Sequence, residues 1–325
     1  MNLENILIFT TIALLLRFLS PSKGRNFLLF LTSILAIYWL QPISPIRNLD
    51  FWLPTLTLSL VFLSWLLTTP REELNWQQNI KTTLILVGLI ILIALTRFIR
   101  MTGVLTASRP PQFGIVLLTL VFLFIIIFLG YHSTQKWKNL SQLGIVLFIT
   151  ILICIKSPFL AGLVSSGLRS LMQQSSSLAN AADIRWLGFS YLAFRIIHTL
   201  RDKQNGRLTA VTLQEYFIYV IFFPSFTAGP IARLDRFIKD LRKPLERFNN
   251  IELINAGKRL ALGLFKKFVL ANGLAVFSLS NQNVFQVQSS GWMWVMIYAY
   301  ALQIYFDFSG YTDIAIGLGK LIGFN

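Results

Sequence analysis

Long apolar blocks separated by short polar gaps make up the first half of the chain. One block, residues 114–130, has no charged or amide side chain, and with its flanks it provides the roughly 20 apolar residues that a membrane-crossing helix needs. Other blocks are shorter, which favours some irregular or partly inserted elements. We predict membrane helices at about residues 5–20, 26–41, 51–68, 82–99, 112–131 and 142–161.

Beyond residue 162 the pattern is more mixed. Residues 163–185 are polar enough for a surface loop or an interfacial helix, and apolar segments resume within residues 186–325. We therefore expect N-terminal transmembrane helices in 1–162, a polar connection in 163–185 and a third region in 186–325. The predicted fold class is an all-α polytopic membrane protein.

A break in the helical pattern is expected early in the third region. Pro224 and Pro230 bracket Gly229, and proline in a helix interior removes a backbone hydrogen bond. Non-helical backbone at membrane depth survives only inside protein or beside a water-filled cavity. The segment is therefore either a re-entrant, cavity-lining element or a turn at the membrane surface.

A basic zone follows this break. Residues 233–247 contain six basic and three acidic residues, and apolar side chains recur among them at helical spacing from Leu234 to Leu245. This pattern predicts a basic amphipathic helix in the headgroup plane on the cytoplasmic side, with a plain anchoring belt as the simpler interpretation. The zone continues at Lys258, Arg259, Lys266 and Lys267.

Composition supports a membrane protein. Hydrophobic residues make up 55% of the chain and charged residues 13%, with a mean hydropathy of +0.64, whereas soluble domains are nearer a quarter charged. The net charge is +16, but the basic residues sit mostly between apolar blocks. That placement favours anionic lipid headgroups as partners and argues against nucleic acid.

Several chemistries lack the residues they need. Cys154 is the only cysteine, and the two histidines, His132 and His198, lie in separate blocks. A disulfide within the chain is therefore excluded, and a zinc site or other bound cofactor is not expected. No GxSxG, P-loop or GxGxxG motif is present.

Two acids in the last apolar block stand out. If the block is helical through Tyr311, then Gln303, Asp307 and Tyr311 share one stripe with Tyr300, and Asp313 lies about 120° from Asp307. A paired-carboxylate site is therefore disfavoured. Each acid at the bilayer centre would cost roughly 2.5–3.5 kcal/mol, so the two either line a functional polar path or pair structurally with basic residues. Gly310 and Gly317 add either a close helix approach or local unwinding.

Two stretches resemble signature sequences of the membrane-bound O-acyltransferase family. They are YVIFFPSFTAGPIARLDRF, residues 219–237, and YALQIYFDFSGYTDIAIGLGKLIGF, residues 300–324. The chain is most similar to the bacterial branch that includes the alginate O-acetylation and D-alanyl teichoic-acid transfer proteins. Weaker similarity extends back to about residue 186.

The resemblance implies about nine to eleven membrane helices or re-entrant segments around a central tunnel in a cell (inner or plasma) membrane. It also implies transfer of an acyl group, with acetyl as the first expectation, to a hydroxyl of a polysaccharide or lipid. The donor would be a thioester of coenzyme A or of an acyl-carrier protein, and a periplasmic protein would be a partner. The residues that it places at the tunnel or substrate are Gln303, Tyr305, Asp307, Ser309, Tyr311, Asp313, Gly229, Pro230 and Arg233.

One expected catalytic group has no counterpart in the chain. The family's histidine, which would take the acceptor's proton, lies beyond the position of Asn325, and neither His132 nor His198 matches it. We therefore expect that the chain represents the N-terminal two-thirds of such an enzyme and transfers no acyl group alone. A transporter or flippase with Asp307 and Asp313 on its path is the alternative, and a non-catalytic scaffold is a third possibility.

Overall fold

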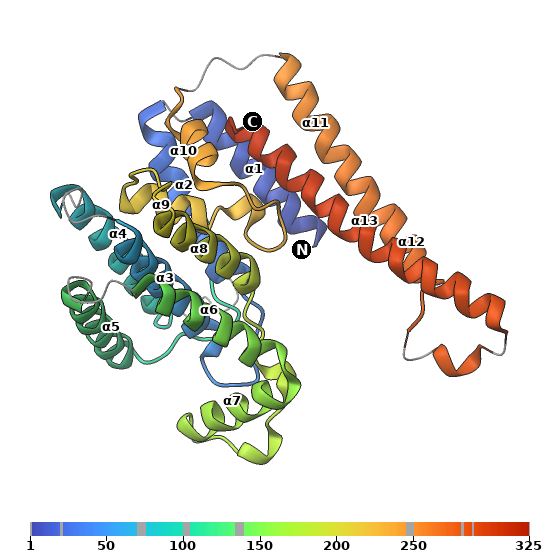
Figure 1. Cartoon of the computed structure of the whole chain (residues 1–325), viewed down its shortest axis with the longest axis horizontal. Coiled ribbons are helices and arrows are strands. Elements are labelled where there is room, and N and C mark those ends of the chain that lie inside the picture. The colour runs from blue at the N-terminus through green and yellow to red at the C-terminus, as the bar shows by residue number, and fades with distance from the viewer. Residues whose placement is uncertain are drawn as a thin grey trace. The chain divides into compact units, whose positions relative to one another are not determined.

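The computed structural model describes residues 2–19, 22–69, 76–99, 105–133, 140–244, 250–280, 283–287 and 289–324. These residues form helices, turns and loops without a β-strand, as the all-α prediction requires (Figure 1). They group into two compact units. One unit contains residues 26–223 and 233–239, and the other contains residues 1–25, 224–232 and 240–325.

The first of these units is organised around one buried helix, α3. Helix α3 contacts the helices α5, α6, α8 and α9, and Leu58, Val61 and Trp65 on it are almost fully buried. The Trp65 indole N–H donates to the carbonyl of Val211 at 3.1 Å. The helices of this unit are α2 (Ser22–Leu40), α3 (Leu49–Thr68), α4 (Trp76–Leu95), α5 (Phe113–Ser133), α6 (Leu140–Lys156), α7 (Pro158–Leu171), α8 (Phe189–Gln204) and α9 (Leu213–Val220).

Five of the six predicted apolar helices are present near their expected positions, but the sixth is interrupted. A single helix was predicted over 142–161, whereas α6 ends at Lys156 and α7 begins at Pro158 after a bend of 93°. Proline is favoured in the first helical turn and tends to kink or break a helix interior, and Pro158 stands at the first position of α7. Judged by length and composition alone, α3 is the one described helix able to cross a membrane, and α6 with α7 would add a second if the bent pair counted as one span.

The predicted helix break between α9 and α10 is confirmed. Helix α9 ends at Val220, a 3-10 turn follows (η4, Phe223–Ser225), and α10 (Leu234–Arg242) starts after an irregular stretch. Buried Arg195 on α8 donates to the carbonyls of Tyr219 and Val220 at 3.1 and 2.9 Å. These bonds satisfy carbonyl groups that the helix end leaves without an intrahelical partner.

The predicted amphipathic helix is present as α10, and its apolar stripe is covered by protein. Leu234 is 2% exposed, Ile238 1% and Leu241 1%. Phe237 packs edge-on against the rings of Tyr219 and Phe222. Aromatic side chains from α9 and from the residues just after it thus pack on the apolar face of α10. Leu245 lies outside the described residues.

The second unit is built on a long helical hairpin. Its helices are α1 (Leu3–Leu19), α11 (Asn250–Leu264), the π-helical segment η5 (Phe265–Ala271), α12 (Asn272–Ala275) and α13 (Ser290–Ile322), with a 3-10 turn η6 (Val284–Gln286) before α13. In Figure 1, α11, η5 and α12 run alongside α13 in the opposite direction, and α1 also contacts α13.

Glycines set the close approach of the two arms. A Cβ atom at Gly310 would lie 2.8 Å from both the Gly263 oxygen and the Lys267 nitrogen, and one at Gly263 would lie 2.6 Å from the Gly310 oxygen. At Gly317 a Cβ would lie 2.7 Å from Leu260. Small residues let helix backbones meet in this way. Of the two alternatives left open for Gly310 and Gly317, the close helix approach is confirmed.

Candidate functional site

A cavity of about 400 Å³ lies beside α13 within the second unit. The predicted polar stripe is present, because α13 is continuous through Tyr311 and Gln303, Asp307 and Tyr311 all face this cavity. Tyr300 does not line it. The complete lining is Thr227, Ala228, Lys267, Gln303, Ile304, Asp307, Phe308 and Tyr311.

The two acids of α13 bind different lysines. The η5 backbone approaches α13 at Gly310, and Asp307 and Asp313 lie three residues to either side of that glycine. Lys267 pairs with Asp307 on the cavity side, and Lys266 donates to Asp313 at 2.6 Å on the other side. Successive helical side chains diverge in direction, so neighbouring lysines reach acids that do not face each other.

Asp313 is a structural acid. Its side chain is only 5% exposed, and it accepts from both Arg259 and Lys266. Lys266 also donates to Ser309 at 3.0 Å. Asp313 does not line the cavity, so this geometry matches the alternative in which an acid pairs with basic residues.

Asp307 has a different environment. Its side chain is 57% exposed and its partner Lys267 is 14% exposed, and both line the cavity. The Gln303 side-chain oxygen is buried and has no hydrogen-bond partner among the described residues. A ligand in this cavity would meet the Lys267 cation and the Asp307 carboxylate, whereas the amide oxygen of Gln303 is covered although the residue lines the cavity.

Tyr311 ties the irregular segment after α9 to α13. Its buried hydroxyl accepts from Thr227 and donates to the carbonyl of Pro224 at 3.3 Å. Thr227 and Ala228 also line the cavity. Of the two alternatives for residues 224–230, the geometry supports the cavity-lining element.

Replacing Tyr311 with phenylalanine is expected to loosen this segment. The change removes the hydrogen bond that Tyr311 donates to Pro224 and the one that it accepts from Thr227, at a cost of about 1–2 kcal/mol. The melting temperature of the purified protein should fall by a few degrees. Tyr305→Phe is the matched control, because Tyr305 is 60% exposed on the same helix; an equal fall for both variants would contradict the role assigned to Tyr311.

The other predicted site residues lie outside the cavity lining. Tyr305 is exposed, and Ser309 binds Lys266. Gly229 is buried and donates to the Ser225 carbonyl at 3.2 Å, whereas Pro230 and Arg233 are exposed. Five lining residues were not among the predicted site residues: Thr227, Ala228, Lys267, Ile304 and Phe308. The available signal for Lys267 was a pair of lysines inside an otherwise apolar block.

The histidines have other surroundings. The Nδ1 atom of His198 lies 3.3 Å from a carboxylate oxygen of Asp202, one turn later on α8. The side chain of His132 lies outside the described residues. Within the described part of the chain, no group of three or more His, Cys, Asp or Glu side chains is placed to hold a metal ion.

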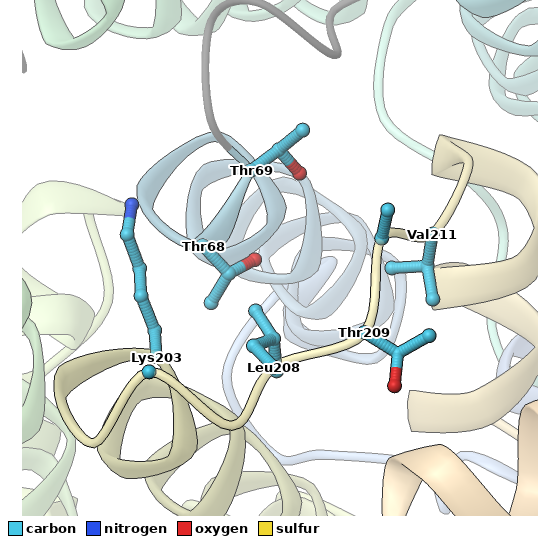
Figure 2. A pocket seen from close by; sticks show the side chains of 8 residues that line it. Thr68, Thr69, Lys203, Leu208, Thr209 and Val211 are labelled. Atoms are coloured by element: carbon cyan, nitrogen blue, oxygen red, sulfur yellow. The ribbon is translucent and has the colours of Figure 1, made fainter.

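A smaller pocket of about 240 Å³ lies in the first unit, at the end of α3. Figure 2 shows Lys203 reaching from α8 along the last turn of α3, with Thr68 and Thr69 beside it. The Lys203 amine donates to the carbonyl of Leu67. A cation at the carboxyl end of a helix satisfies free carbonyls and is favoured by the helix dipole, so Lys203 acts as a cap between α8 and α3.

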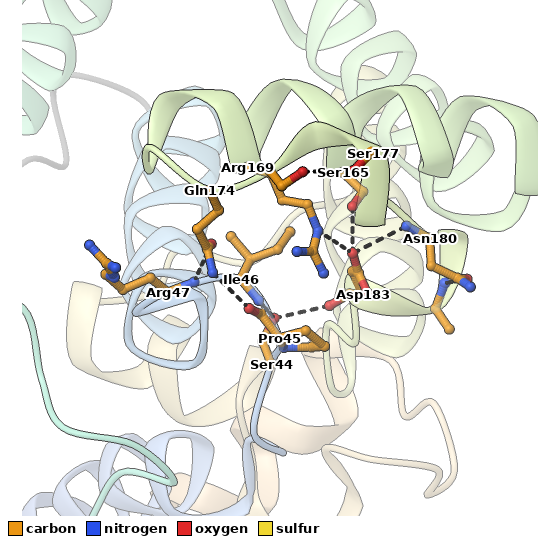
Figure 3. Close-up of polar contacts among 12 residues, drawn as sticks. Ser44, Pro45, Ile46, Arg47, Ser165, Arg169, Gln174, Ser177, Asn180 and Asp183 are labelled. Carbon is orange, nitrogen blue, oxygen red and sulfur yellow. Dashed lines mark hydrogen bonds and ion pairs between the residues drawn. The ribbon is translucent and has the colours of Figure 1, made fainter.

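A buried polar cluster surrounds Asp183, in the 3-10 turn η3 (Ala181–Asp183). One carboxylate oxygen accepts from Arg169 at 2.9 Å and from Ser165 at 2.7 Å (Figure 3). Burial raises the pKa of Asp183, but the hydrogen bonds from Arg169, Ser165 and the Asn180 amide outweigh it, so the pKa lies below its usual value.

This lowered pKa predicts an acid-sensitive contact. The stabilisation is fully present above the unfolded pKa of about 3.9 and is lost as the pH falls through the lower folded value. The melting temperature of the wild-type protein should therefore fall below about pH 4 more steeply than that of Asp183→Asn, which is expected to be less stable at neutral pH. Parallel pH curves for the two proteins would contradict this expectation.

Comparison with known proteins agrees with the two sequence stretches. Residues 16–325 match the membrane-bound O-acyltransferase (MBOAT) family. The teichoic acid D-alanyltransferase of Streptococcus thermophilus is 32% identical over 149 residues, which are 43% of this chain and 35% of that protein. A protein of Pseudomonas putida named probable alginate O-acetylase is 36% identical over 146 residues, 42% of this chain and 28% of the relative.

The matched segment thus spans about a third of the length of these curated relatives. The relatives are of the two kinds expected from the resemblance. The family match covers nearly the whole chain and is consistent with the helical fold and the apolar composition. The chain therefore belongs to the membrane-bound O-acyltransferase family.

Proposed function

We propose that this protein is a multi-pass membrane enzyme that moves an acyl group from a thioester donor to a hydroxyl of a polysaccharide or lipid. Acetyl is the acyl group that we propose first. The acceptor oxygen attacks the thioester carbonyl carbon, an ester forms, and the thiol leaves with the proton that the hydroxyl gives up. Coenzyme A or an acyl-carrier protein would carry the donor, and a periplasmic partner protein would complete the transfer.

One observation carries the proposed location of this chemistry. The two family-like stretches, 219–237 and 300–324, both contribute to the cavity: Thr227 and Ala228 come from the first, and five lining residues come from the second. In this proposal the Lys267 ammonium, held by Asp307, stabilises the negative charge that develops on the thioester carbonyl oxygen.

The test measures acyl transfer by membranes in which the whole open reading frame that encodes these residues is expressed. Radiolabelled acetyl-coenzyme A and a labelled D-alanyl carrier protein are supplied separately, and alkali-labile label in polysaccharide and lipid is measured. Label above a vector control with either donor is expected. Absence of label with both donors, when the protein is present and folded, would refute acyl transfer.

The transporter alternative gains less support from the geometry. It would place both Asp307 and Asp313 on a substrate path, yet Asp313 is buried in two ion pairs and does not line the cavity. Asp307 alone faces the open space. One exposed acid beside a lysine is as consistent with a substrate-binding site as with a transport path through the membrane.

A further inference from the structure

Helix α7 is amphipathic with its polar side turned inward. Ala161, Ser165 and Arg169 recur at a spacing of four residues and are 1%, 0% and 6% exposed, so they share one face of the helix. Ser165 and Arg169 both bind Asp183 (Figure 3). On the same side, Leu168 packs against the small buried cluster of Ile46, Leu49 and Leu53. The protein itself thus satisfies the polar face of α7.

The opposite face of α7 is apolar and uncovered among the described residues. Phe159 is 73% exposed, Leu163 56% and Leu171 78%. Gly167 and Ser170 are exposed on the same face. Large apolar side chains gathered on one exposed face are unfavourable in water and mark an interaction surface. Helix α6 also has exposed apolar side chains, at Leu143, Val146, Leu147, Ile149 and Ile153.

The direction of α7 and its flanks identify what covers this face. Helix α6 is apolar, and α7 leaves it at 93°, so if α6 crosses the bilayer then α7 runs along the bilayer plane. Lys156 lies at the corner between them, and a polar stretch, residues 173–177, follows α7. Basic and polar side chains of this kind sit at headgroup level.

We propose that α7 lies in the plane of the membrane at the boundary between headgroups and acyl chains. The row formed by Phe159, Leu163 and Leu171 enters the acyl chains of the lipid bilayer, and the Ser165–Arg169 side rests on the loop that carries Asp183. The inference concerns how the chain sits in the bilayer and does not depend on which acyl group is transferred.

Nitroxide depth measurements on the reconstituted protein test this placement. In a Cys154→Ser background, which leaves no native cysteine, labels are attached at Phe159→Cys, Leu163→Cys and Leu171→Cys in phosphatidylcholine–phosphatidylglycerol vesicles. Collision rates with oxygen and with a water-soluble nickel chelate give the depth. All three labels are expected at one depth, about 5–10 Å below the headgroups.

Two control sites calibrate the result. Labels at Val146→Cys and Ile153→Cys on α6 should differ in depth by about 10 Å, as expected for a helix that crosses the bilayer. Residues 159 and 171 are about 18 Å apart along the helix axis. A difference in depth between these two labels that approaches this distance would overturn the proposal. Ready collision with the nickel chelate at all three sites, or shielding from both reagents by protein, would overturn it as well.

Discussion

Asp313→Ala is expected to lower the stability of the protein more than any other single change in α13. The carboxylate is 5% exposed and balances two cations, Arg259 and Lys266. Removing one partner of a buried ion pair costs about 3–5 kcal/mol. Because Arg259 is 45% exposed and Lys266 21% exposed, we expect the lower end of this range, about 3 kcal/mol. Lys266 would keep only its bond to Ser309. A fall in melting temperature of roughly 6 °C or more, measured in detergent, would follow.

Asp307→Ala provides the matched comparison on the same helix. Asp307 also pairs with a lysine, but Asp307 is 57% exposed, and Lys267, although 14% exposed, lines the cavity. Water in the cavity can solvate the lysine after the change, so the cost is expected to be about 1 kcal/mol, as for exposed ion pairs. Asp307→Ala should therefore change the melting temperature little while it reduces acyl transfer. Equal destabilisation by the two alanine variants would contradict the division into a structural acid and a cavity acid.

Gly310→Ala is expected to have the second-largest effect. The added Cβ would lie 2.8 Å from two backbone atoms, the Gly263 oxygen and the Lys267 nitrogen. Backbone atoms cannot rotate aside, so α11, η5 and α13 must separate, at a cost of about 2–3 kcal/mol. The separation would also pull Lys267 away from Asp307. Both the melting temperature and acyl transfer should therefore fall.

Gly257→Ala is the control for this change. Gly257 lies on α11, and an added Cβ there meets no atom within 4 Å. Alanine favours a helix over glycine by about 0.5–1 kcal/mol, so this variant should be as stable as the wild-type protein or slightly more so. If both glycine variants behave alike, the close approach at Gly310 does not hold the hairpin together.

The sequence predicted most helices because long apolar blocks and polar gaps are local signals. It also separated the two acids correctly, because a six-residue spacing on a helix fixes their directions. The break at Pro158 had a visible signal, yet the apolar run through residue 161 masked it. For α10, the pattern identified an amphipathic helix but not what covers its apolar face, which depends on aromatic residues elsewhere in the chain.

The partners of the acids could not be predicted from local patterns. Lys266 and Lys267 precede Asp307 and Asp313 by some 40 to 47 residues, and their reach depends on a π-helical turn and on a glycine contact with another helix. Likewise, Tyr311 meets Thr227 only because the segment after α9 returns to α13. Contacts of this kind are set by tertiary packing.

The most direct test of the cavity as the acyl-transfer site compares Lys267→Met with Lys258→Met in the transfer assay. Lys267 lines the cavity and binds Asp307, whereas Lys258 is exposed on α11. Removing a group that stabilises transition-state charge typically costs about a hundredfold or more in rate. We predict such a loss for Lys267→Met, with near wild-type transfer for Lys258→Met and similar folded yields for both. Equal transfer rates for the two variants would contradict the assignment of the cavity.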